Sequence, residues 1–184
     1  MNKPESLQQL YAGYHNKAWL LSELRSDHAG ETGAVWIYRG ILAVTRNPEL
    51  REFSRRHLQT ELEHLALMDQ LVPPAERSRL LVPWRIAGFL TGAMPAMFGP
   101  RMTFRVISSV ETFVEAHYLA QVRRLRRDGL EALAALLARC LQDEVAHQQE
   151  AAFLAGDSHG GLDLCIDAVI TRGSALAVAA ARRF

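Results

Sequence analysis

Apolar residues recur along the chain at the three- and four-residue spacing of amphipathic helices, and no stretch alternates as a half-buried strand would. The pattern divides at proline, glycine and asparagine into long segments. Four of these segments have the length of bundle helices: 18–45, 48–72, 101–127 and 130–155. Each pair of neighbouring segments is divided by a helix-ending signal. Asn47-Pro48 lies between the first two segments, and Asp128-Gly129 lies between the last two. The pattern therefore predicts two helix pairs.

Two further segments are apolar over most of their length. Segment 80–98 contains small residues at Gly88, Gly92 and Ala96, and we predict a short helix that crosses between the two pairs. Segment 162–183 is rich in alanine and predicts a last helix. Neither contains a run of about 18 uninterrupted apolar residues, so we expect no membrane-spanning helix.

The two apolar segments carry more hydrophobic surface than a four-helix core needs. Basic residues punctuate or flank them: Arg79, Arg85, Arg101, Arg172, Arg182 and Arg183. An apolar face with a basic rim suits a helix that lies on an anionic membrane. The alternative is that these helices complete the bundle or bury a dimer interface.

Length and composition favour one all-α domain over residues 1–184, with 1–17 as an N-terminal extension. The formal net charge is +1, which gives no general reason to expect nucleic-acid binding. Cys140 and Cys165 do not have the spacing of a disulfide framework, which suits a reducing compartment. Residues 1–10 lack a long apolar core, so we expect no signal peptide.

A Glu-x-x-His motif lies on the second helix of each predicted pair: Glu61 with His64, and Glu144 with His147. Positions i and i+3 share a helix face, so each motif can direct a carboxylate and an imidazole at one point. A single such motif arises easily by chance. Here, however, Glu31 precedes Glu61 by 30 positions and Glu111 precedes Glu144 by 33, each on the first helix of its pair.

Tyrosines extend the likeness between the two halves. Tyr38 follows Glu31, and Tyr118 follows Glu111, by the same seven positions. Two helical turns cover about 7.2 residues, so each tyrosine lies on the face of its glutamate. A duplicated helix pair explains the whole pattern.

The duplicated motifs predict a metal site in the bundle core, because a buried carboxylate is costly unless it is paired or bound to metal. One glutamate from each of two helices and a Glu-x-x-His from each of the other two is the pattern of ferritin-like carboxylate proteins. The predicted ligands are Glu31, Glu61, His64, Glu111, Glu144 and His147. Carboxylate and imidazole ligands favour two iron or manganese ions, and oxygen chemistry favours iron. We expect Glu61 and Glu144 to bridge the ions and Glu31 and Glu111 to be terminal.

Residues near these ligands are candidates for orienting them. We expect Tyr38, Tyr118 and Asp143 to lie just outside the ligands. Metal-bound histidines usually donate their second N–H to an acceptor, and Asp27, one turn before Glu31, is another candidate for that role.

The remaining histidines divide into two groups. His28 is a candidate to orient a ligand or cap a helix, and His117 is a candidate to line a substrate entrance. The others are expected to be solvated: His15, His57 and His159.

Residues 26–34, Ser-Asp-His-Ala-Gly-Glu-Thr-Gly-Ala, resemble the signature of the demethoxyubiquinone hydroxylases. Further similar motifs follow in order: Ile37-Tyr38-Arg39-Gly40, Glu61-Leu62-Glu63-His64, Gly88-Phe89 with Gly92-Ala93, Val110-Glu111 with His117-Tyr118, and Asp143-Glu144 with His147. The likeness extends from about residue 24 to the C-terminus.

The resemblance implies a ferritin-like four-helix bundle with a di-iron centre on the six residues named above. Such a protein would hydroxylate the ring of a polyprenyl quinone intermediate in ubiquinone biosynthesis. It would use oxygen and an external reductant, for which NADH is a candidate. From the apolar segments and their basic residues we further expect a peripheral protein on the cytoplasmic face of the inner or plasma membrane. A lipid-presenting partner protein and a homo-oligomer are candidate assemblies.

Two other functions are compatible with a di-iron bundle. An iron oxidase or storage protein would need an acidic interior or entry pore, which the near-neutral charge and apolar segment 80–98 argue against. A tRNA-modifying di-iron hydroxylase could use the basic run of Arg123, Arg124, Arg126 and Arg127. That run also suits a solvated helix end, which the helix dipole would stabilise.

Overall fold

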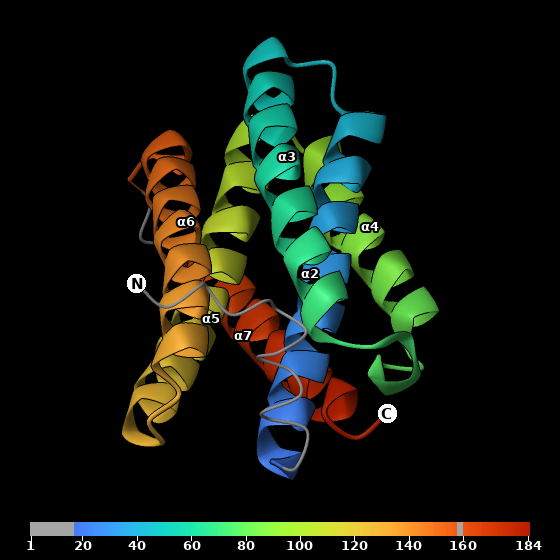
Figure 1. Ribbon diagram of the computed structural model, residues 1–184. Coiled ribbons are helices and arrows are strands. Elements are labelled where there is room, and N and C mark those ends of the chain that lie inside the picture. Colours follow the sequence, from blue (N-terminus) through green and yellow to red (C-terminus); the bar gives the residue numbers. More distant parts are fainter. Residues whose placement is uncertain (1–16, 158–159) are drawn as a thin grey trace.

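The computed structural model describes residues 17–157 and 160–184, and its regular structure is helical throughout (Figure 1). The helices are α2 (Ala18–Val44), α3 (Pro48–Leu71), α4 (Leu81–Met97), α5 (Pro100–Arg127), α6 (Glu131–Ala155) and α7 (Gly161–Ala181), with a 3-10 turn at Pro74–Glu76. No strand occurs within the described ranges. The all-α prediction is confirmed, and the four long helices end within one residue of their predicted bounds. The predicted extension 1–17 lies outside the described residues, except for Lys17.

The helix boundaries follow from local chemistry. The Asn47 side chain accepts a hydrogen bond of 2.9 Å from the Leu50 N–H, and Pro48 occupies the first turn of α3, where no N–H is needed. Gly129, with φ of 72°, makes the turn between α5 and α6 in a conformation that favours glycine. Short connections of this kind keep the two helices of each pair adjacent.

Helices α2 and α3 form one pair, and α5 and α6 form the other (Figure 1). Helix α4 links the pairs, as predicted, but it packs mainly along α2. Helix α7 passes across α5 and α2 at the bottom of the view in Figure 1. The bundle is therefore a four-helix core with α4 and α7 added to one side.

Glycines bring the backbones of α2 and α4 into direct contact. A Cβ added to Gly92 would lie 2.0 Å from the carbonyl oxygen of Ile37, and one added to Gly88 would lie 2.3 Å from that of Gly33. From the other side, a Cβ on Gly40 would lie 2.2 Å from a carbonyl oxygen of α4. The small residues noted in segment 80–98 are therefore needed for the close approach of two helices.

Two apolar clusters fill the bundle on either side of a polar layer. One cluster includes Leu24, Met68, Val122 and Leu137, and the other includes Ile41, Phe53, Ile107 and Ala151. On each of the four bundle helices the predicted ligands fall between the residues of the two clusters. The hydrophobic core therefore fixes the helices above and below the site.

Helix α7 is tied to the bundle at both ends. Near its start, Asp163 pairs with Arg105 of α5 at 3.4 Å. After its end, Arg182 pairs with Glu23 of α2 at 2.7 Å, and the carbonyl oxygen of Phe184 accepts a hydrogen bond from the backbone N–H of Arg79. These contacts hold α7 across the helices of both pairs.

Residues Asp163–Ala181 are nevertheless long and apolar enough to cross a membrane, with a mean hydropathy of 1.6. The expectation of no membrane-spanning helix rested on a different criterion, an uninterrupted apolar run, and a helix that qualifies by length and composition alone does not contradict it. Asp163, Asp167 and Arg172 interrupt the apolar run, but they are too few to lower its mean hydropathy below the range of spanning helices. Length and composition alone do not distinguish a spanning helix from one that lies on a bundle.

The glycine contact predicts the effect of Gly92→Leu. The new side chain must separate α2 from α4, so the free energy of unfolding should fall by about 2 kcal/mol or more. Urea unfolding measures the change. The control is Gly173→Ala in α7, where an added Cβ meets no atom within 4 Å. Equal stability of Gly92→Leu and the unchanged protein would contradict the close packing.

Candidate metal centre

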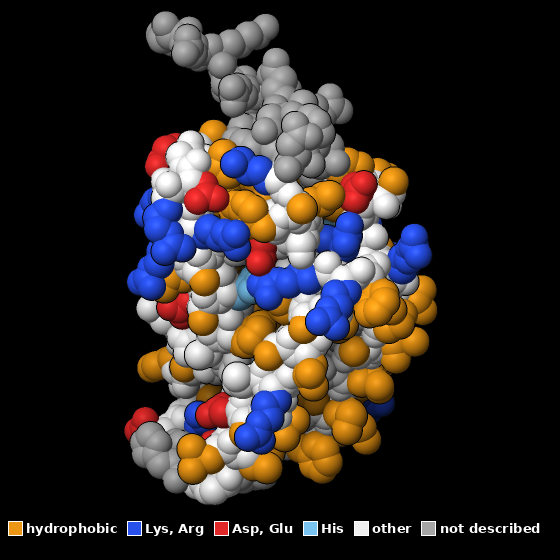
Figure 2. Space-filling model, turned by 90° about the horizontal axis from the view of Figure 1, so that it is seen from below, with side chains coloured by type: hydrophobic (Ala, Val, Ile, Leu, Met, Phe, Trp, Pro, Cys, Tyr) orange, Lys and Arg blue, Asp and Glu red, His pale blue; other side chains and the backbone are white. Residues whose placement is uncertain are grey.

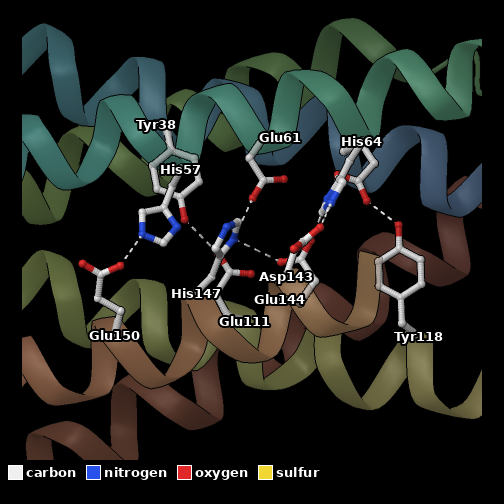
Figure 3. A network of polar contacts seen from close by, with 11 residues as sticks. Tyr38, His57, Glu61, His64, Glu111, Tyr118, Asp143, Glu144, His147 and Glu150 are labelled. Carbon is white, nitrogen blue, oxygen red and sulfur yellow. Dashed lines mark hydrogen bonds and ion pairs between the residues drawn. The ribbon is translucent and has the colours of Figure 1, made fainter. Parts of the chain in front are cut away.

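The six predicted ligands converge in the polar layer between the two apolar clusters (Figure 3). Each bundle helix contributes to the set: Glu31 from α2, Glu61 and His64 from α3, Glu111 from α5, and Glu144 and His147 from α6. All six are buried, with at most 5 % of any residue exposed. The structure thus brings together every residue that the motifs singled out.

These residues form two overlapping groups, and the ligand atoms of each group lie within 4.8 Å of one another. The groups consist of Glu31, Glu61, His64 and Glu144, and of Glu61, Glu111, Glu144 and His147. Glu61 and Glu144 belong to both groups, which is the arrangement that bridging carboxylates require. His64 Nδ1 lies 3.0 Å from Glu144 Oε1, and His147 Nδ1 lies 3.2 Å from Glu61 Oε1.

Buried atoms that make no hydrogen bond point to a cation at this place. Nδ1 of His64, Nδ1 of His147 and Oε1 of Glu61 are buried and meet no hydrogen-bond geometry, so their polar contacts are limited to ion pairs between imidazole and carboxylate. Such atoms are costly in a protein interior unless something else satisfies them. Carboxylate oxygens and imidazole nitrogens are suitable donors for iron or manganese. The residues present therefore fit divalent metal of that class.

The pKa values of the buried carboxyls in the metal-free protein also indicate that this cluster requires positive charge. Burial, and then the neighbouring Glu144 carboxylate, raise the pKa values of Glu61 and Glu111 well above the ordinary range for glutamate. Burial raises the pKa of Glu31 to about 7. Burial would also raise the pKa of Glu144, but the imidazoles of His147 and His64 outweigh it and lower that pKa to about 2. Protons or cations must therefore neutralise part of this cluster.

The two tyrosines donate hydrogen bonds across the bundle. The hydroxyl of Tyr38 donates to Glu111 Oε1 at 3.0 Å, and that of Tyr118 donates to Glu31 Oε1. Each tyrosine thus shares a helix face with one glutamate but bonds the glutamate of the other half. Seven residues correspond to about 10 Å along a helix, too far for contact within one half. The expected proximity of both tyrosines to the ligands is present, in this crossed form.

The two acidic residues expected near the ligands have different partners. Asp143 lies 3.1 Å from His64 Nε2, on the ring edge opposite Nδ1, as predicted. Asp27 does not reach a ligand histidine, and that expectation was wrong. It lies 2.9 Å from Nε2 of His117 and accepts a 2.8 Å hydrogen bond from Gln121, because it faces α5 rather than the Glu-x-x-His helices.

Two expectations about the other histidines were also wrong. His28 contacts Asp69 of α3 at 3.1 Å and orients no ligand. His57 is buried rather than solvated, and its Nε2 lies 2.9 Å from Glu150. The spacing of His57, one turn before Glu61, was the signal that could have placed it beside the site. The predictions for His15 and His159 fall outside the described residues.

An apolar cavity of about 390 Å³ leads to the carboxylates. Side chains of α2, α4, α5 and α7 form most of its wall, and His117 lines it as expected. All four buried glutamates of the site line the same cavity: Glu31, Glu61, Glu111 and Glu144. Helix α7 contributes small and aliphatic residues, among them Val169, Gly173 and Ala177. The cavity therefore joins a largely apolar space to a strongly polar end.

Large hydrophobic side chains are also exposed on the surface of the protein. Figure 2 shows them gathered toward the side where α4 lies, with Lys and Arg side chains beside them. The exposed residues on or next to α4 are Val82, Ile86, Leu90, Met94, Met97 and Phe98; those of the C-terminal region are Leu164, Val169, Leu176 and Phe184. Of the predicted basic rim, Arg101 donates to the carbonyl oxygens of Ala155 and Asp157, and Arg182 pairs with Glu23. Two arginines of the predicted basic rim therefore make contacts within the protein.

Comparison with known proteins agrees with the resemblance of the motifs. The chain is 36 % identical over 128 residues to the mitochondrial NADPH-dependent 3-demethoxyubiquinone 3-hydroxylase of Dictyostelium discoideum, covering 67 % of this chain and 59 % of that protein. It is 38 % identical over 128 residues to the 3-demethoxyubiquinol 3-hydroxylase of Rhodospirillum rubrum, covering 68 % and 60 %. The match to these curated relatives thus spans less than two thirds of their length.

The family described as "Ubiquinone biosynthesis protein COQ7" matches residues 18–181, from the first residue of α2 to the last residue of α7. The matched region contains all six residues of the buried cluster and the helices that form the cavity. The chain therefore belongs to the ubiquinone biosynthesis protein COQ7 family.

Proposed function

We propose that this protein is an oxygen-dependent hydroxylase of a quinone ring, acting on a polyprenylated demethoxyubiquinone-type intermediate of ubiquinone biosynthesis. The observation that carries the proposal is the apolar cavity that ends on four buried carboxylates. Such a cavity can hold a hydrophobic molecule while its reacting part faces a metal site. The relatives from Dictyostelium discoideum and Rhodospirillum rubrum are named as hydroxylases of the same class of quinone.

Two iron ions would be held by the two overlapping groups of ligands. Glu61 and Glu144 would bridge them, while Glu31 with His64 and Glu111 with His147 would each serve one ion. When bound, the ions supply the redox chemistry by which oxygen and an external reductant hydroxylate the ring. The relative from Dictyostelium is named as NADPH-dependent, whereas NADH was the candidate from the sequence. A nicotinamide cofactor as reductant remains part of the proposal.

The protein's own residues would bind the substrate and keep water away. Gly30 and Gly33 line the cavity beside Glu31 and leave room next to the carboxylates because they have no side chains. The aliphatic wall from α7 would hold the polyprenyl chain. Tyr38 and Tyr118 would orient the carboxylates of Glu111 and Glu31 through their hydroxyl donors. Fixed carboxylates give the site a defined geometry before substrate arrives.

We also propose that the protein is a single di-iron domain that works at a membrane surface. The exposed apolar side chains of α4 and α7 support a peripheral position. We place the protein on the cytoplasmic face of the inner or plasma membrane as part of this proposal. A polyprenyl quinone would enter the cavity from that surface. The same exposed side chains could contact a lipid-presenting partner or a second copy of this chain.

The other two functions receive less support. Iron storage does not require an apolar cavity beside the ligands. The basic run at the end of α5 is partly engaged, because the Arg124 guanidinium lies 3.8 Å from the centre of the Trp19 ring. A quinone hydroxylase accounts for the metal ligands and the cavity together.

The first prediction from the proposed function concerns Glu144→Ala. The unchanged protein should bind two iron(II) ions per chain without oxygen, and the variant should retain fewer than two, because both groups share Glu144. Metal analysis and Mössbauer spectra measure the content. Glu63→Ala, an exposed glutamate on α3, is the control and should keep both ions. An unchanged protein that does not take up two ions would remove the basis of the proposal.

The second prediction concerns the cavity wall. Ala177→Phe fills part of the cavity and should raise KM for the quinone by about tenfold or more at unchanged iron content. Ala179→Phe places the same ring on an exposed position of α7 and should leave KM near that of the unchanged protein. Steady-state assays with both variants make the comparison. Equal KM values would show that the substrate does not use this cavity.

The third prediction concerns cells. Loss of the protein should cause accumulation of a quinone precursor that lacks one methoxy group, because its ring would not be hydroxylated. Quinone profiling by mass spectrometry detects this precursor. Normal ubiquinone without the precursor would exclude the proposed reaction.

The fourth prediction concerns pH. In the metal-free protein, Glu31, Glu61 and Glu111 keep protons that the unfolded chain loses above its ordinary pKa of 4.5. The folded state then binds more protons, so its stability should fall as pH rises from about 5 to about 7. Iron(II) replaces those protons, so the loaded protein should lack this loss and should release protons on binding. Thermal unfolding at several pH values tests both statements.

A further inference from the structure

We propose that His57, held by Glu150, is a positioning residue for one of the two ions, the ion served by Glu111 and His147. This inference rests on the proposed function, because it concerns the geometry of a bound ion. It assigns a role to a histidine–carboxylate pair that lies outside the six ligands.

His57 contacts the group that would hold this ion in two ways. Its ring meets the His147 ring edge to face, with 4.1 Å between the ring centres and 72° between the planes. Its ring also stacks on Tyr38, with centres 5.8 Å apart and planes at 17°. The Tyr38 hydroxyl in turn donates to Glu111. His57 therefore supports one ligand directly and a second through the tyrosine.

His57 itself is held firmly from the far side. Its Nε2 lies 2.9 Å from Glu150 Oε2, and the Arg56 guanidinium donates to both oxygens of Glu150 at 2.6 and 3.3 Å. The Phe53 ring lies 4.0 Å from the centre of the imidazole. In Figure 3, His57 stands between Glu150 and His147, with Tyr38 behind it. The pair of Glu150 and His57 thus links α6 to α3 next to the site.

The other ion position is supported differently. There the ligand histidine His64 has a carboxylate, Asp143, 3.1 Å from its Nε2. His147 contacts Glu61 and Glu144 through Nδ1. Among the described residues, no carboxylate lies within ion-pair distance of its Nε2. The residue one turn before each Glu-x-x-His motif also differs, being His57 in one half and Cys140 in the other. The duplicated halves thus hold their two ligand histidines by different means.

A test can separate the two ion positions. His57→Ala removes the ring that supports His147 and should weaken binding of one iron(II) ion by about 10- to 100-fold, the usual effect of losing a group that orients a metal ligand. The other ion should keep its affinity. Anaerobic iron(II) titration gives the two affinities, and Mössbauer spectra should show a change in one of two iron signals. Asp143→Asn should instead lower the affinity for the other iron(II) ion.

Glu150 offers a milder variant and a matched control. Glu150→Ala removes a half-exposed carboxylate that pairs with a buried histidine and an arginine. Asp69 has the same kinds of partner, His28 and Arg77, at 3.1 and 2.8 Å. Glu150→Ala and Asp69→Ala should therefore lose similar amounts of stability. Only Glu150→Ala should weaken the binding of one iron ion. If His57→Ala does not fold, Glu150→Ala decides the question.

The outcomes distinguish this inference from the proposed function. Two tightly bound ions with unchanged spectra in both His57→Ala and Glu150→Ala would overturn the role of His57 and leave the proposed function standing. Equal weakening in Asp69→Ala would also overturn it, because the effect would then follow from lost stability. An unchanged protein that fails to bind two iron ions would overturn both proposals.

Discussion

Four glutamates buried at one point are the constraint on which the rest of the structure depends. Removing carboxylates from water is costly, and their mutual repulsion adds to that cost. Two imidazoles and two tyrosine hydroxyls lower this cost by pairing with the carboxylates. The pKa values of three of the carboxyls nevertheless remain raised. Two divalent cations would carry the four positive charges that match four carboxylates. Apolar clusters above and below keep the four helices in place against this repulsion.

The twofold repeat explains how so short a motif builds a closed site. Each half supplies a glutamate, a tyrosine and a Glu-x-x-His, and the halves face each other, so that Tyr38 bonds Glu111 and Tyr118 bonds Glu31. Neither half can therefore complete the site alone. The surroundings depart from the repeat, with Asp143 beside one ligand histidine and His57 beside the other. A duplicated scaffold can thus give two ion positions with different properties.

The opening of the site depends on the added helices. Backbone contact at Gly88 and Gly92 sets α4 close against α2, and ion pairs at both ends hold α7 across α5 and α2. These helices wall a space of about 390 Å³ that ends on the carboxylates. Without α4 and α7 the carboxylates would lose the part of the apolar wall that these helices supply. The fold therefore joins a polar core to an apolar cavity.

Periodicity and spacing alone determined the helices, their ends and the six residues that meet in the core. This was possible because helix geometry is local: positions i, i+3 and i+7 share a face in any bundle. Which residues meet across helices was decided only by packing. The crossed tyrosine bonds, the burial of His57 and the turning of Asp27 toward α5 all depend on how neighbouring helices are rotated and offset. Those quantities are set by contacts between residues far apart in the chain, which a pattern along the sequence does not contain.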